Sequence, residues 1–131
     1  MAKSDIVLVP IDFSRGADKA LDYALRLARE RGGKVLALHV VPAELVYPPM
    51  GGRFDFYGLL ERDARANFAK LLKRKRLQPK ECELMLARGT DFADIIARQA
   101  KKLRVSMIVM GSHGRTGLRR FLLGSVAERT L

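Results

Sequence analysis

The feature that most constrains this chain is an apolar run followed by glycines at fixed spacing. The run from Val105 to Met110 predicts a buried strand. It is followed by Gly111, Gly114 and Gly124 in the spacing Gly-x2-Gly-x9-Gly, and the hydroxyl residue Ser125 comes directly after Gly124. A strand, a glycine-rich loop and the start of a helix leave backbone N–H groups free to face an anion. The order predicts a phosphate site, because glycines that only turn the chain would explain one of these positions but not all three.

The rest of the chain alternates apolar runs with helical patterns. Continuous apolar runs at residues 6–11, 34–41 and 82–87 predict three more strands, the last near a sheet edge. Helical spacing predicts helices that follow Ser14 and Thr90 as N-caps, and one from about Gly58 to Arg76. Strands that alternate with helices predict an α/β fold with a doubly wound parallel sheet, in a single domain spanning residues 1–131.

Charge and composition limit the partners. The formal net charge is +11, and residues 53–131 carry 18 Lys and Arg against 8 Asp and Glu. Such a basic half suits nucleic acid, anionic lipid or acidic partners, but a nucleotide site needs positive charge as well. Nucleic acid is not expected, because the aromatic residues do not interleave with the basic ones. The basic run Lys73–Arg76 fits either a solvated helix end or a recognition patch.

Membrane insertion and a protein metal site are not expected. No apolar run reaches the ~20 residues that span a bilayer, and the first five residues lack the form of a signal peptide, which predicts a cytoplasmic protein. The single cysteine, Cys82, with only His39 and His113, makes no set of zinc ligands. Cys82 is expected to be an inert core residue and His39 a core histidine.

The glycines and serine described above resemble the phosphate motif of the nucleotide-binding class of the universal stress protein family. Val7–Ser14 resembles that family's first strand with its aspartate, and Gly89 the glycine after its third strand. The resemblance implies a Rossmann-like sheet of the adenine nucleotide alpha hydrolase type, with strand order 3-2-1-4. Relatives continue into a fifth strand, but this sequence stops at Leu131. We therefore expect that strand to be missing, which would leave strand 105–110 at an open edge prone to association.

A sheet of this order predicts where a ligand binds. Ligands of open α/β sheets lie outside the carboxyl ends of the strands where the order reverses, here between Asp12 and Gly111. Asp12 could accept from ribose hydroxyls, help to hold a metal, or only cap the next helix. By the resemblance, the residues that hold an adenine nucleotide are Pro10, Ile11, Asp12, Val40, Val41, Met110, Gly111, His113, Gly114, Arg115, Gly124, Ser125 and Val126.

The resemblance implies ATP as the ligand, with Mg²⁺ or Mn²⁺ bridging the phosphates, in a homodimer that acts as a nucleotide-dependent switch or binding module in stress response. At most slow hydrolysis is expected, because no base is positioned for water and His113 has no nucleophile beside it. A Walker lysine and the Gly-x-Gly-x-x-Gly of NAD and FAD sites are absent. Two alternatives stay open: a nucleic-acid or anionic-surface binding module, and an AMP-preferring or ligand-free structural member.

Overall fold

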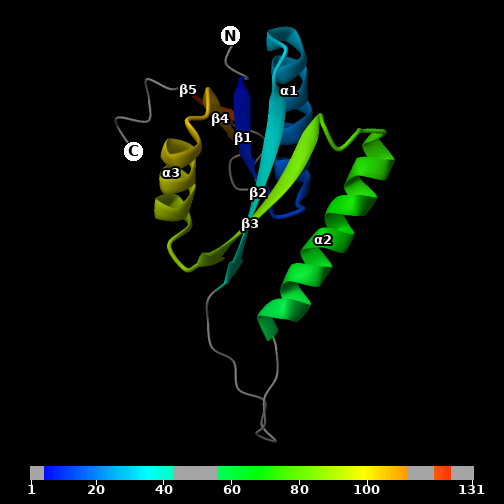
Figure 1. Ribbon diagram of the computed structural model, residues 1–131, viewed down its shortest axis with the longest axis vertical. Coiled ribbons are helices and arrows are strands. Elements are labelled where there is room, and N and C mark those ends of the chain that lie inside the picture. The colour runs from blue at the N-terminus through cyan, green and yellow to red at the C-terminus, as the bar shows by residue number, and fades with distance from the viewer. Residues whose placement is uncertain (1–4, 43–55, 112–119, 125–131) are drawn as a thin grey trace, which may run out of the picture.

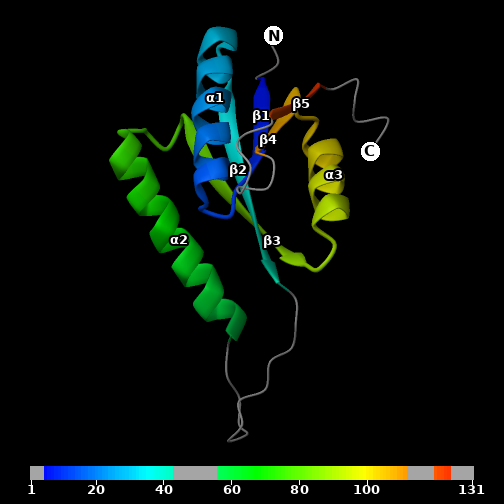
Figure 2. The ribbon, with the colours of Figure 1, turned by 180° about the vertical axis from the view of Figure 1, so that it is seen from behind.

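One twisted sheet carries helices on both faces in this computed structural model, which describes residues 5–42, 56–111 and 120–124. Figures 1 and 2 show α1 and α2 on one face of the sheet and α3 on the other. The elements in chain order are β1 (Ile6–Pro10), α1 (Arg15–Arg31), β2 (Lys34–Pro42), α2 (Phe56–Lys75), β3 (Cys82–Gly89), α3 (Phe92–Leu103), β4 (Met107–Gly111) and β5 (Arg120–Gly124).

The order of the parallel strands confirms the sequence prediction. The sheet runs β3-β2-β1-β4-β5, so the first four strands have the predicted order 3-2-1-4. β1 pairs in parallel with β2 on one side and β4 on the other, and β2 pairs in parallel with β3. A helix lies between each pair of consecutive parallel strands, as parallel pairing requires. The order reverses between β1 and β4, and their carboxyl ends meet at one edge of the sheet.

The fifth strand is a correction to the sequence analysis. β5 pairs antiparallel with β4, with Gly124 opposite Met107 and Arg120 opposite Gly111. The expectation that no fifth strand lies beside the fourth is therefore wrong, as is the expectation of an open edge at residues 105–110. Gly124, expected at the start of a helix, is the last residue of β5. β5 pairs with β4 because an apolar edge strand with unpaired N–H and C=O groups is a template for any extended segment within reach.

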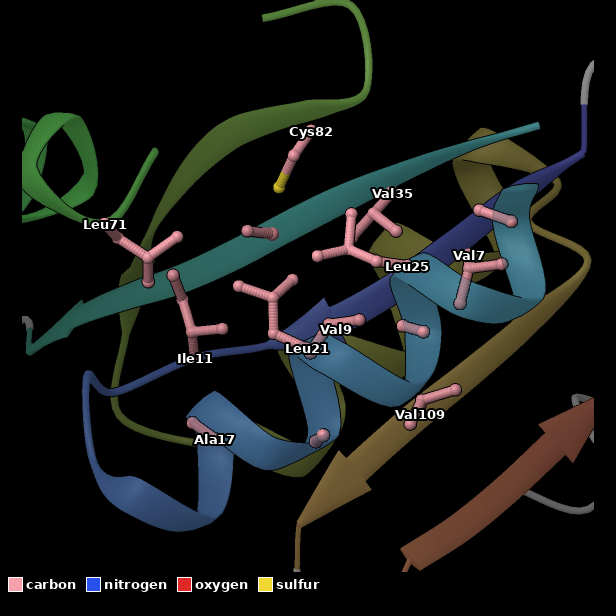
Figure 3. Packing of buried hydrophobic residues seen from close by; sticks show 14 of the residues in the cluster. Val7, Val9, Ile11, Ala17, Leu21, Leu25, Val35, Leu71, Cys82 and Val109 are labelled. Atoms are coloured by element: carbon pink, nitrogen blue, oxygen red, sulfur yellow. The ribbon is translucent and has the colours of Figure 1, made fainter. Parts of the chain in front are cut away.

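The core explains why the strands read as continuous apolar runs. Val7 and Val9 pack in a cluster with α1 on one face, while Leu8 packs in a second cluster with α3 on the other. Figure 3 shows the side chains of α1 facing those of β1 and β2 in the first cluster. The buried face of α1 combines Leu21 and Leu25 with small residues that bring its axis close to the sheet: Gly16, Ala17, Ala20, Ala24 and Ala28.

Helix ends follow local chemistry, with one change from the prediction. The Ser14 hydroxyl accepts from the Ala17 N–H at 3.2 Å and caps α1 as expected. At the start of α3 the cap is Asp91, not Thr90, because the Asp91 carboxylate accepts from the Asp94 N–H at 3.1 Å. A carboxylate also interacts favourably with the helix dipole there.

The basic end of α2 is neither simply solvated nor a free patch. Arg74 donates to Asp18 of α1 at 2.8 Å, and Lys75 donates to Asp18 at 3.1 Å and to Asp22 at 2.6 Å. These contacts tie α2 to α1 and neutralise half of the four-residue basic run. Among the described helices, none is long and apolar enough to cross a membrane.

Cys82 occupies the core, as predicted. It is 1% exposed and belongs to the cluster between the sheet and α1. Burial raises the pKa of its thiol to about 12, and the neighbouring carboxylates of Glu81 and Glu83 add to the shift. The thiol is therefore protonated near neutral pH, which is the form that reacts poorly.

Candidate functional site

A cavity of about 320 Å³ lies where β1, β2 and β4 end. Its volume falls in the range of small-molecule sites, ~300–1,000 Å³. Asp12 and Gly111 both line it, so the structure brings together two positions about a hundred residues apart in sequence. The other lining residues are Pro10, Ile11, Ser14, Ala17, Leu38, His39, Val40, Phe92, Ile96 and Met110.

The loop that carries Asp12 is held in a defined conformation. Asp12 Oδ1 accepts from the Ser14 N–H at 2.9 Å, and Phe13 between them has the left-handed backbone angle φ of 64°. A non-glycine residue pays on the order of 1–2 kcal/mol for that conformation, so neighbouring contacts must hold it. The Phe13 ring packs against His39 at a centroid distance of 5.2 Å. Asp12 is exposed, with its carboxylate oriented by its own turn.

His39 supports this loop and also lines the cavity. Its Nδ1 lies 2.9 Å from the Ile11 carbonyl oxygen, which can only accept, so Nδ1 carries a proton. The Ile11 N–H in turn donates to the Leu38 carbonyl at 2.8 Å, continuing the β1–β2 pairing by one residue. His39 is half-buried rather than enclosed in the core. It is a positioning residue that links the end of β2 to the Asp12 turn.

Gly111 is required by packing even before a ligand is considered. A Cβ at this position would lie 2.7 Å from the Gly16 carbonyl oxygen and 2.9 Å from the Gly16 carbonyl carbon. Real Cβ atoms essentially never approach backbone that closely, so a side chain would push β4 away from the first turn of α1. Gly16 is itself buried. The close approach of β4 and α1 thus fixes one wall of the cavity.

A sequence model described as the universal stress protein family matches residues 3–131. The chain belongs to the universal stress protein family. It is 32% identical over 127 residues to the universal stress protein MJ0531 of Methanocaldococcus jannaschii, covering 95% of this chain and 74% of that protein. It is 31% identical to the universal stress protein YxiE of Bacillus subtilis, covering 94% and 88%.

A solved structure gives the same fold with a ligand. The universal stress protein from Archaeoglobus fulgidus in complex with dAMP is 29% identical and superposes with a TM-score of 0.59. The match covers 89% of this chain and 86% of that one. The family resemblance seen in the sequence is therefore confirmed, and so is the α/β fold that it implied.

The family's expected site residues fall into three groups. Six line the cavity together: Pro10, Ile11, Asp12, Val40, Met110 and Gly111. Val41 is not among the lining residues, and its side chain is completely buried. Gly124 is paired with Met107, at the opposite end of β4 from Gly111, so the structure does not bring these two glycines together. His113, Gly114, Arg115, Ser125 and Val126 lie outside the described residues.

Sequence reasoning missed part of the cavity wall. His39 was assigned to the core and Phe92 was not considered, yet both line the cavity. The sequence predicts Ser14 only as a helix cap, yet it lines the cavity too, as does Ile96 of α3. The sequence does carry one signal for Phe92. It is the first residue of the helix after β3, and that helix begins at the end of the sheet where the carboxyl ends of β1 and β4 lie.

Proposed function

We propose that this member of the universal stress protein family binds an adenine nucleotide, ATP in particular, at the carboxyl ends of β1, β2 and β4. The observation that carries the proposal is the cavity that Asp12 and Gly111 line together, at the point where the strand order reverses. The Archaeoglobus relative in complex with dAMP supports an adenine nucleotide as the ligand class.

Each wall of the cavity suits a different part of the nucleotide. Pro10, Val40 and Met110 offer apolar contact to a base. Asp12 Oδ1 is occupied by the Ser14 N–H, and the described residues give its other oxygen, Oδ2, no partner. That oxygen is the acceptor for a ribose hydroxyl, in a turn that already fixes its direction. The nucleoside thus lies across the ends of β1 and β2, with its phosphates toward Gly111.

The phosphates are proposed to follow Gly111 into the segment with Gly114 and Ser125. Gly124 can join them only if β5 leaves β4, because it is paired with Met107 in this structure. Phosphate binding by the whole motif and the pairing of β5 therefore exclude each other. Two mutually exclusive arrangements of one segment are what a nucleotide-dependent switch requires, since the ligand favours only one of them.

We also propose that Mg²⁺ or Mn²⁺ accompanies the phosphates of the bound nucleotide. Within the described part of the chain no group of three His, Cys, Asp or Glu side chains is placed to hold a metal. Asp12 is the only carboxylate among the described lining residues, and its Oδ2 is already assigned to a ribose hydroxyl, so the ion would be held by phosphate and water oxygens rather than by a protein ligand set. The ion would neutralise phosphate charge. At most slow hydrolysis is proposed, because the described lining residues include no arginine or lysine to stabilise charge on a transferred phosphoryl group.

The assembly is proposed to be a homodimer that works in the cytoplasm. The sequence predicts association through an open edge on β4, but β5 pairs with that edge in this structure. The outermost strands of the described sheet are now β3 and β5. An edge of this kind is a template for pairing with a second copy. Sedimentation at several concentrations would show whether the protein is a dimer.

Calorimetry tests the nucleotide site directly. ATP with Mg²⁺ should bind the wild-type protein, and Asp12→Asn should bind about tenfold more weakly, because hydrogen bonds to charged groups are worth ~1.5–3 kcal/mol. Asp63→Asn is the matched control, since Asp63 is exposed on α2 and does not line the cavity. Equal affinity in Asp12→Asn and wild type would contradict the assignment of Asp12. No binding of ATP, AMP or dAMP at millimolar concentration would overturn the function.

A second candidate is an anionic partner in the hollow between β3 and α3. Four of the eight residues that line this hollow of about 640 Å³ are basic: Arg88, Arg98, Lys101 and Lys102. Two of them are already paired, Arg88 with Glu61 at 3.3 Å and Arg98 with Asp94 at 2.7 Å. Of the four basic residues that line this hollow, only Lys101 and Lys102 have no ion pair within the described part of the chain. The surface therefore offers an anion two unpaired positive charges.

An oligonucleotide titration separates the two functions. At ~150 mM salt a nonspecific binder has a Kd of about 10⁻⁴–10⁻⁶ M, so a submicromolar Kd for a random oligonucleotide would favour the second candidate. Lys101→Ala with Lys102→Ala should then weaken binding, while the control pair Lys19→Ala with Lys80→Ala should not. Displacement by ATP would instead indicate that the oligonucleotide phosphates occupy the nucleotide site.

A further inference from the structure

Phe92 is a large aromatic side chain that is not buried in either core cluster. It opens α3 and is 51% exposed, and Leu59 is the other large hydrophobic residue exposed in the described part of the chain. Exposing an aromatic ring forgoes the stabilisation that its burial would give. Unlike Leu59, Phe92 lines the candidate nucleotide cavity. Its exposed surface therefore faces a space of ligand size.

The position of Phe92 follows from the geometry of α3. Ile96 stands four residues later, so both side chains lie on the same face of the helix. That face packs on the sheet, where Ile96 is 9% exposed and Ala100 is completely buried in the cluster with Leu8 and Leu38. Figures 1 and 2 show α3 beginning at the end of the sheet where β2 and β3 finish. Phe92 stands one turn before Ile96, and both side chains line the cavity.

The first turn of α3 is also fixed, so the ring is presented from a rigid element. Asp91 caps the helix through the Asp94 N–H at 3.1 Å, and the Asp91 carbonyl accepts from the Ile95 N–H at 3.0 Å. Gly89, which ends β3, packs so closely on Ile95 that a Cβ would clash with its side chain. The start of α3 cannot shift outward without losing these contacts.

We propose that Phe92 stacks on the base of the bound nucleotide and closes the cavity against Pro10 and Val40 on the other side. This inference rests on the proposed function and names the residue that makes the site respond to the base. Replacing an aromatic ring that stacks on a base by alanine weakens binding by about 5- to 150-fold. A site with this ring selects ligands that carry a planar base over ligands that carry phosphates alone.

A fluorescence experiment tests the stacking without relying on affinity. The chain has no tryptophan, so Phe92→Trp introduces a single indole at the mouth of the cavity. ATP and adenosine should quench that indole on binding, because the base stacks on it, while inorganic triphosphate should not. Leu59→Trp is the matched control, since Leu59 is 39% exposed on α2 and does not line the cavity. Its fluorescence should not respond to adenosine.

Calorimetry completes the test. Phe92→Ala should bind ATP about tenfold more weakly than wild type, Phe92→Tyr about as well, and neither should change the affinity for inorganic triphosphate. If wild type binds ATP and Phe92→Ala binds it equally well, or if the Phe92→Trp indole does not respond to adenosine, the stacking role is wrong and the nucleotide site stands. If wild type binds no adenine nucleotide, the proposed function fails and the inference fails with it. Phe92→Tyr and Phe92→Trp keep the test decisive should Phe92→Ala fail to fold.

Discussion

The two faces of the sheet are covered in different ways. On one face α1 spans 17 residues, of which seven are buried, and α2 packs beside it. On the other face α3 spans 12 residues and buries three of them. Both helices begin at the end of the sheet where the cavity lies. The first turn of α1 contains small buried residues, whereas α3 begins with the exposed ring of Phe92. The difference indicates that the α1 face carries the stability of the fold, while the start of α3 is available for a ligand.

The comparison predicts its largest effect in the core under α1. Leu21→Ala should lower the free energy of unfolding by about 3 kcal/mol, because Leu21 is completely buried and truncation leaves a cavity as well as lost apolar contact. Leu103→Ala on α3 should lower it by about 1 kcal/mol, since Leu103 is only partly buried. Urea unfolding of both variants measures the difference. Equal losses would show that α3 carries as much of the core as α1.

The second prediction concerns the contact that joins β4 to α1 beside the cavity. Gly111→Ala should destabilise the fold by about 2 kcal/mol, because its Cβ would lie 2.7 Å from the Gly16 carbonyl oxygen and something must shift. Gly32→Ala is the control: its φ is 68°, but nothing lies within 4 Å of the added Cβ. It should lose about 1 kcal/mol, from backbone strain alone. Thermal unfolding compares the two, and a larger loss in Gly32→Ala would remove the packing argument for Gly111.

The third prediction separates the residues that start the two helices. Ser14→Ala and Asp91→Ala should each lower the free energy of unfolding by about 1 kcal/mol, because each removes the acceptor for a helical N–H at 3.2 or 3.1 Å. Thr90→Ala should be close to neutral, since Asp91 holds the cap that the sequence assigned to Thr90. Chemical denaturation of the three variants is the measurement. A loss in Thr90→Ala as large as in Asp91→Ala would restore the original assignment.

Much of the fold was predictable because its signals are local. Strands buried on both faces read as continuous apolar runs, and the spacing of Leu21 and Leu25 identifies the packing face of α1 from a short stretch of sequence. The meeting of Asp12 with Gly111 was also predictable, since it follows from strand order and not from either residue. Helix-capping residues are local too, but Thr90 and Asp91 are adjacent and both can cap, so sequence alone did not decide between them.

The parts that escaped prediction depend on contacts distant in sequence. β5 pairs with β4 because an apolar strand edge is available to it, and the glycine spacing favoured a different use of Gly124. His39 reads as a core histidine until the Ile11 carbonyl and the Phe13 ring are placed beside it. Phe92 is one more apolar residue on a helix until the ends of β1, β2 and β4 are placed around the same cavity. None of these outcomes follows from the residues on either side in the chain.

Near neutral pH the smallest expected effect on stability belongs to the ionisation of Cys82, which is buried on the face that α1 covers. Burial holds the pKa of its thiol at about 12 instead of 9.0, so between those values the unfolded chain loses a proton that the folded chain keeps. The unfolded state then binds fewer protons, and stability falls as pH rises through this range, while below pH 9 the thiol contributes no pH dependence. Cys82→Ala should remove the part of the stability loss at alkaline pH that comes from the ionisation of this thiol.

At pH 8 the native Cys82 thiol should react with iodoacetamide far more slowly than in urea, because it is both protonated and 1% exposed. Mass spectrometry of the alkylated chain gives the two rates. Equal rates in buffer and in urea would show that the Cys82 thiol is as accessible in the folded protein as in the unfolded chain.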